Sequence, residues 1–151
     1  MLETEPYPER VTTAVADGDS MRYYPAFDLP SRAGLPAPDP VVGRFRAQLL
    51  VAQRASGELT IGDTHHDEEP YDFALDERPF RHLLDRAESL LGARLPPVRR
   101  RWAGVYSQVT TSEVCVRVET EPGVVVITGL GGRGMTLSPA VAEETFDERK
   151  P

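Results

Sequence analysis

The feature that most constrains the fold of this 151-residue chain is a glycine-rich segment near its C-terminal end. Residues 129–134 read Gly-Leu-Gly-Gly-Arg-Gly and separate the apolar run Val124–Thr128 from a helix-like stretch. This is the G-x-G-x-x-G spacing of a dinucleotide-binding loop, in which glycines let a phosphate approach the backbone at a helix N-terminus. Such a fold also needs a second strand, but the acidic residues at a suitable distance, Glu143, Glu144 and Asp147, fall on the helix itself. The pattern therefore predicts strand, loop and helix without a complete βαβ unit.

An amphipathic helix is predicted over Asp76–Leu91. Its apolar residues recur at the three- and four-residue spacing that puts side chains on one helix face, and they are Phe80, Leu83, Leu84, Ala87, Leu90 and Leu91. Asp76 suits the N-cap, Pro79 falls in the first turn and Gly92 provides a C-terminal stop. Because one face of this helix is apolar, we expect that face to pack against the core of the fold.

Strands are predicted on both sides of this helix. Apolar and polar residues alternate over residues 45–52, and Glu58–Gly62 follows a turn as the hairpin partner. Further strands are expected over Val98–Ser107, Glu113–Thr120 and Val124–Thr128. The predicted fold class is α+β, with a mostly antiparallel sheet, one packed amphipathic helix, and a C-terminal strand, glycine loop and helix.

Charge and cysteine content exclude several classes of protein. The net charge of −7 disfavours a general nucleic-acid-binding surface, and the run Arg99–Arg101 is expected to be a solvated strand edge. Cys115 is the only cysteine, so no intramolecular disulfide forms, and it is expected to pack at the margin of a sheet. No apolar run approaches the length of a membrane helix, and the acidic start is unlike a targeting peptide. These features predict a cytoplasmic protein with no membrane or nucleic-acid partner.

The acidic loop around His65 and His66 resembles a metal site in composition only. Adjacent side chains of an extended segment point to opposite sides, so the two histidines are not expected to share one ion. We therefore predict no metal. Ser138 lacks the G-x-S-x-G context of a nucleophile, and a helix-capping role suffices for it.

Five segments of the chain match one known family. They are the C-terminal run Val124–Glu143, the W-x-G strand at Arg101–Tyr106, the hairpin at Gly57–His65, and the stretches Leu2–Pro6 and Arg22–Phe27. Together they resemble the C-terminal portion of FAD-dependent oxidoreductases of the D-amino-acid-oxidase-like family, which includes glycine and sarcosine oxidases. The hairpin resembles that of one branch of the family, some members of which are associated with amine or aminophosphonate breakdown. The segment after the W-x-G strand departs from the family because it lacks the D-G-x-P turn.

The resemblance implies a cofactor, a substrate class and a set of site residues. The cofactor is FAD, and the substrate is a small amine or amino acid that loses a hydride to the flavin before the imine hydrolyses. The residues implied to contact the flavin are Gly129, Leu130, Gly131, Gly132, Arg133, Gly134, Met135 and Thr136. The residues implied on the substrate side are His65, Tyr24 and Tyr106.

The resemblance also implies how the chain is organised. Residues 1–123 would form a substrate-domain-like part and residues 124–146 the flavin-contacting part of a single, incomplete domain. The Rossmann unit that holds the FAD pyrophosphate in the family has no counterpart in these residues, so a separate Rossmann polypeptide is a candidate partner. FAD binding by this chain alone is then expected to be weak or absent. The alternative is a non-catalytic remnant or binding module that does not hold FAD.

Overall fold

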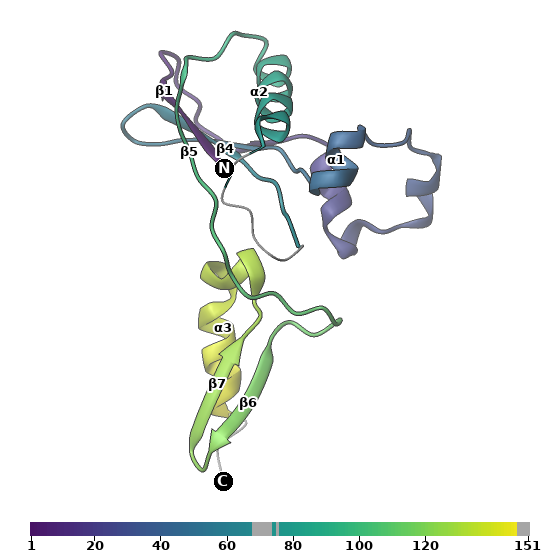
Figure 1. Cartoon of the computed structure of the whole chain (residues 1–151), viewed down its shortest axis with the longest axis vertical. Coiled ribbons are helices and arrows are strands. Elements are labelled where there is room, and N and C mark those ends of the chain that lie inside the picture. The colour runs from purple at the N-terminus through teal and green to yellow at the C-terminus, as the bar shows by residue number, and fades with distance from the viewer. Residues whose placement is uncertain (68–73, 75, 148–151) are drawn as a thin grey trace. The chain divides into compact units, whose positions relative to one another are not determined.

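The computed structural model of the protein describes residues 1–67, 74 and 76–147. The chain divides into two compact units, Met1–Ala103 and Gly104–Pro151, called here the N-terminal and C-terminal units (Figure 1). The division expected between residues 123 and 124 falls at the turn of a hairpin within the C-terminal unit. Whether residues 124–146 act as a separate functional part stays a prediction.

The N-terminal unit is built on one antiparallel sheet. Its strands are β1 (Leu2–Pro6), β2 (Val15–Ala16), β3 (Leu50–Gln53), β4 (Glu58–Gly62) and β5 (Val98–Arg101), in the order β2-β3-β4-β1-β5. β1 therefore lies between β4 and β5, although about 95 residues separate it in sequence from β5. The register pairs Glu3 with Thr60 on one side and with Arg100 on the other.

Helix α2 (Glu77–Leu91) packs on one face of this sheet (Figure 1). The Asp76 side chain accepts a hydrogen bond from the Arg78 N–H, and Gly92 ends the helix in the left-handed conformation. The buried core joins helix residues to alternate strand residues, and it consists of Leu2, Tyr7, Leu49, Val51, Leu59, Ile61, Phe80, Leu83 and Ala87. Leu90 was expected on the same face but is 44% exposed. Leu90 lies ten residues after Phe80, and at about 100° per residue its side chain points about 80° away from that of Phe80. This places Leu90 at the margin of the apolar face.

The predicted strand over residues 45–52 is wrong in its first half. Helix α1 (Pro40–Phe45), with Asp39 as its N-cap and Pro40 at its first residue, ends at the first residue of that range, and residues 46–49 form a turn and an irregular segment. Arg46 ends α1 with a φ of 43°, which turns the chain before β3 begins at Leu50. Three short 3-10 helices come earlier: η1 (Asp19–Tyr23), η2 (Pro25–Phe27) and η3 (Pro30–Gly34). The apolar residues of the alternating pattern, Ala47 and Leu49, are nevertheless buried.

The C-terminal unit is a hairpin covered by one helix. Strand β6 (Val116–Glu121) pairs antiparallel with β7 (Val124–Thr128), and η4 (Gly131–Arg133) leads into α3 (Gly134–Asp147) (Figure 1). Arg117 of β6 forms an ion pair with Glu144 of α3, and Val141 is buried. Cys115 is buried just before β6, as expected. The α+β class, the antiparallel sheet and the C-terminal helix are confirmed.

Candidate functional site

The fold itself requires two glycines of the 129–134 loop. Gly129 has a φ of 84° and Gly131 a φ of 63°, a region that other residues rarely adopt. A Cβ at Gly129 would lie 2.6 Å from Cγ1 of Val109, and one at Gly131 would lie 2.9 Å from Oε1 of Gln108. The segment before β6 fills this side of the loop through hydrogen bonds from the Val109 N–H to the Gly129 carbonyl and from the Gly131 N–H to the Ser107 carbonyl, 3.0 Å each.

The other side of the loop faces outward. Gly132, Arg133, Met135 and Thr136 are exposed, whereas Gly129 is buried. No side chain caps the N-terminus of η4. A helix N-terminus carries a partial positive charge that favours an anionic group. The loop therefore offers backbone and a positive helix end, with no bulky side chain at Gly132.

Tyr106 is the one predicted substrate-side residue that lies next to this loop. Its hydroxyl oxygen would be 3.4 Å from a Cβ placed on Gly132, and its ring is partly exposed. Tyr106 and the eight loop residues therefore form one group within the C-terminal unit.

His65 and Tyr24 belong to a second group, in the N-terminal unit. Tyr23 joins them, because its ring stacks on His65 at 4.6 Å between centroids and meets Tyr24 edge-on at 5.2 Å. The guanidinium of Arg46 lies over the Tyr23 ring, 5.2 Å from its centre. The His65 side chain is only 7% exposed, and its Nε2 is 3.7 Å from the Asp63 carboxylate. Its Nδ1 lies 3.3 Å from the Arg46 carbonyl.

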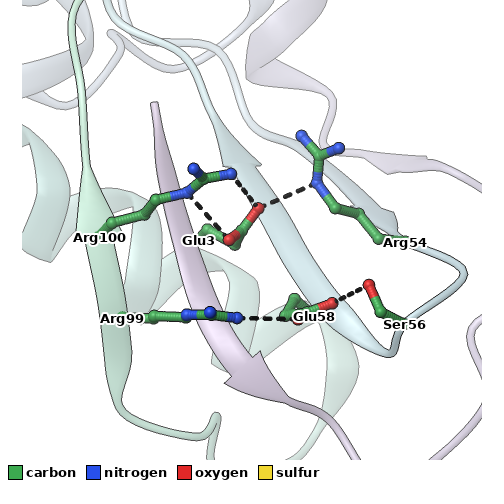
Figure 2. Close-up of a pocket in the computed structure, with 6 residues that line it drawn as sticks. All are labelled: Glu3, Arg54, Ser56, Glu58, Arg99 and Arg100. Atoms are coloured by element: carbon green, nitrogen blue, oxygen red, sulfur yellow. Dashed lines mark hydrogen bonds and ion pairs between the residues drawn. The ribbon is translucent and has the colours of Figure 1, made fainter.

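The sequence did not predict a cluster of arginines and glutamates on the N-terminal sheet (Figure 2). Glu3 of β1 is 3% exposed and binds two arginines, Arg54 and Arg100, at 3.0 Å. Arg99 is 3.0 Å from Glu58, and Ser56 donates a hydrogen bond to the same carboxylate. The hydrogen bond from Ser56, with smaller contributions that include Arg99, lowers the pKa of Glu58 below its ordinary value.

The run Arg99–Arg101 is thus on an edge strand, as expected, but all three of its side chains are paired with carboxylates. Sequence proximity could not reveal the pairing, because Glu3 and Arg100 are 97 positions apart. The six residues Glu3, Arg54, Ser56, Glu58, Arg99 and Arg100 line a cavity of about 330 Å³.

Neither a metal-ligand cluster nor a membrane-spanning helix is found among the described residues. No three His, Cys, Asp or Glu side chains gather there as a potential metal-ligand set. No helix in the described part of the chain has the length and apolar character needed to cross a membrane.

Comparison with known proteins gives one match. The family model described as FAD dependent oxidoreductase matches residues 8–148, which is nearly the whole chain. The chain therefore belongs to the FAD-dependent oxidoreductase family. No curated protein matches, and no solved structure matches.

The outward side of the glycine loop fits the cofactor of this family. Among the described residues, a Cβ at Gly134 would have only Leu130 within 4 Å, at 3.9 Å, and a Cβ at Gly132 would touch only the end of the Tyr106 ring. Space beside the backbone at these two positions lets a flat ring approach closely. The glycines on the inward side, Gly129 and Gly131, have positive φ and close neighbours, so the fold alone requires a glycine at each.

Proposed function

We propose that this chain supplies the substrate-domain and flavin-contacting part of an FAD-dependent oxidoreductase that oxidises a small amine or amino acid. The observation that carries the proposal is the family match over residues 8–148, which includes the whole 129–136 loop. When bound, FAD would accept the hydride that leaves the carbon beside the amine nitrogen. An aminophosphonate is one candidate within this substrate class.

The flavin would be held by the outward side of the loop. The backbone of Gly132 and Arg133, in η4 directly before α3, would contact the ring, and the helix N-terminus would stabilise negative charge there. Leu130, Gly134, Met135 and Thr136 would complete the contact, while Gly129 and Gly131 shape the loop. Tyr106, beside Gly132, would line the substrate side of the ring.

His65 would be a substrate-side residue contributed by the N-terminal unit. Its ring orientation is fixed by the stack on Tyr23 and by the contacts to Asp63 and Arg46. A ring held in this way would keep a constant orientation, which favours a positioning role over a mobile one. Tyr24 would support this stack from the side of Tyr23.

The FAD pyrophosphate would be held by a Rossmann unit, on the same or on a separate polypeptide. The G-x-G-x-x-G of this chain follows β7, whose described neighbour β6 is antiparallel, whereas a pyrophosphate loop belongs to a parallel βαβ unit. The loop is therefore proposed to serve the ring end of FAD.

Reconstitution tests this proposal. The chain is mixed with an FAD-loaded Rossmann unit from a flavoenzyme of the same family, and the visible flavin spectrum is followed without oxygen while amines are added. We expect a perturbed flavin spectrum on mixing and amine-dependent bleaching as the hydride reaches the ring. A perturbed spectrum without bleaching by any amine or amino acid would support flavin contact but contradict the substrate class. An unchanged spectrum would contradict both and favour a non-catalytic binding module.

A further inference from the structure

We propose that the arginine-lined cavity on the N-terminal sheet is a binding site for a small tetrahedral oxyanion, a phosphate or phosphate-ester group. The six residues that define the cavity come from β1, from β4 and the turn before it, and from β5 (Figure 2). None of them belongs to the residues proposed to contact flavin or amine. The inference therefore stands independently of the proposed function.

The two glutamates orient the arginines and leave spare donors. Both oxygens of Glu3 are occupied. Arg100 donates a hydrogen bond from Nη2 to Oε2, and its Nε forms an ion pair with Oε1, while the Nε of Arg54 forms an ion pair with Oε2, all at 3.0 Å. The Nε of Arg54 is also 2.9 Å from the Thr60 hydroxyl. Figure 2 shows the two terminal nitrogens of Arg54 directed away from Glu3. Within the described part of the chain these two nitrogens have no protein acceptor.

Arg99 is bound in a similar way. Its Nη1 donates to Glu58 at 3.0 Å, and the second oxygen of Glu58 accepts from Ser56. Among the described residues nothing accepts from its Nε or Nη2. A guanidinium has five N–H donors, so Arg54 and Arg99 each keep several for a ligand.

The charge and exposure of the cluster favour an anion. Three guanidinium groups face two carboxylates, so the cavity carries a net positive charge in a chain whose total is −7. The glutamate side chains are 4% and 10% exposed, whereas those of Arg54, Arg99 and Arg100 are 51%, 53% and 59% exposed. The two carboxylates are thus buried at the bottom of the cavity, and the N–H donors of the arginines reach the side of the cavity that is open to solvent.

The arrangement of donors favours a tetrahedral group over a carboxylate. One guanidinium fork satisfies both oxygens of a planar carboxylate. Here the donors come from separate strands and a turn, which suits an ion with three terminal oxygens in different directions. The cavity volume of about 330 Å³ is ample for such a group with water around it.

Titration of the ¹⁵N-labelled full chain with inorganic phosphate, followed by NMR at constant ionic strength, tests the site. We expect saturable shifts of the arginine Nε–H signals and of the Ser56 and Glu58 amides, with a Kd on the order of 1 mM. Arg54→Gln and Arg99→Gln should each weaken binding about tenfold, because each removes a charge-assisted donor set. Arg94→Gln is the matched control, since Arg94 is 93% exposed and pairs with Glu88 outside the cavity. The Arg94→Gln variant should bind phosphate with the same affinity as the wild type.

Two further ligands identify the class and source of the oxyanion. Tighter binding of ethyl phosphate than of phosphate would assign an esterified ligand and the reverse order a free ion, and both support the site. Acetate that binds as tightly as phosphate would overturn the tetrahedral class. The absence of saturable shifts in the wild type, or an equal loss in Arg94→Gln, would overturn the site. If Arg54→Gln does not fold, Arg99→Gln decides the test, because Arg99 contacts Glu58 through one nitrogen only.

Discussion

At the scale of single residues, the glycine loop combines two different demands. Gly129 and Gly131 need positive φ and lie against Val109 and Gln108, so the fold alone explains them. Gly132 and Gly134 have neither requirement. A substitution at Gly132 therefore tests the contact with a ligand, whereas a substitution at Gly129 tests the stability of the fold.

Gly129→Ala should destabilise the C-terminal unit by roughly 1 to 3 kcal/mol, because it combines a left-handed backbone with a 2.6 Å contact to Val109. Hydrogen exchange of the β6–β7 amides under native conditions measures this loss directly. Gly134→Ala is the control and should be neutral or slightly stabilising, because Gly134 begins α3 with helical backbone angles. Equal protection in both variants would contradict the account of Gly129.

Asp17 gives the N-terminal unit a pH-dependent contribution to stability. Burial alone would raise the pKa of Asp17, but hydrogen bonds from Ser20 and Arg86 outweigh it and lower the pKa. Ser20 in turn bonds the Leu49 backbone in both directions, so the carboxylate anchors η1 to the strand region. Because folding lowers this pKa, the ionised Asp17 side chain stabilises the fold at pH values above the unfolded-state pKa of about 3.9. This stabilisation is lost as the pH falls through the folded-state pKa.

Asp17→Asn should cost roughly 1 to 2 kcal/mol near neutral pH, since the amide keeps one acceptor but loses the charge facing Arg86. Urea unfolding at several pH values should show that the wild type loses its advantage over the variant below about pH 4. Asp85→Asn, on the exposed side of α2, is the control and should leave the pH dependence unchanged. An advantage of the wild type that persists at low pH would contradict the role of the charge.

At the scale of secondary-structure elements, local signals decided what could be predicted. Helix α2 was predicted within one residue because its N-cap, apolar spacing and C-terminal glycine agree. The strand expected from residue 45 was wrong in its first half because period-two spacing does not distinguish a strand from an irregular segment in which alternate residues, here Ala47 and Leu49, are also buried. The glycine loop was predictable as a contiguous motif, whereas the Glu3 cluster depends on β1 lying beside β5, a non-local pairing.

Leu83→Ala should destabilise the N-terminal unit by about 2 to 4 kcal/mol, because Leu83 is 1% exposed in the core between α2 and the sheet. Leu90→Ala removes the same atoms from a side chain that is 44% exposed and should cost less than about 1 kcal/mol. Chemical denaturation of both variants compares the two sites. Similar losses would show that Leu90 packs as the sequence pattern predicted.

At the scale of the whole molecule, the C-terminal unit has one open apolar face. Val118 of β6 pairs with Val126 of β7, and these side chains are 48% and 46% exposed. Val116 and Val124 add to the same face and are 42% and 49% exposed. Exposed apolar patches of this kind favour association.

Val118→Thr together with Val126→Thr should therefore reduce self-association while keeping two β-branched residues in the hairpin. Sedimentation velocity over a range of protein concentrations measures the effect. Val105→Thr, at an exposed position outside the hairpin, is the control. A wild type that stays monomeric throughout the range would rule out this role for the hairpin face.

The central claim is that the outward side of the 129–136 loop contacts flavin, and flavin affinity in the reconstituted complex tests it most directly. We compare the wild type with Gly132→Val, using Gly104→Val as the control because a Cβ at Gly104 would meet no atom of the described residues within 4 Å. The account predicts that Gly132→Val weakens FAD binding about tenfold or more while the control does not, because the added side chain obstructs the approach of the ring to the backbone. Equal FAD affinity in all three proteins would contradict the claim.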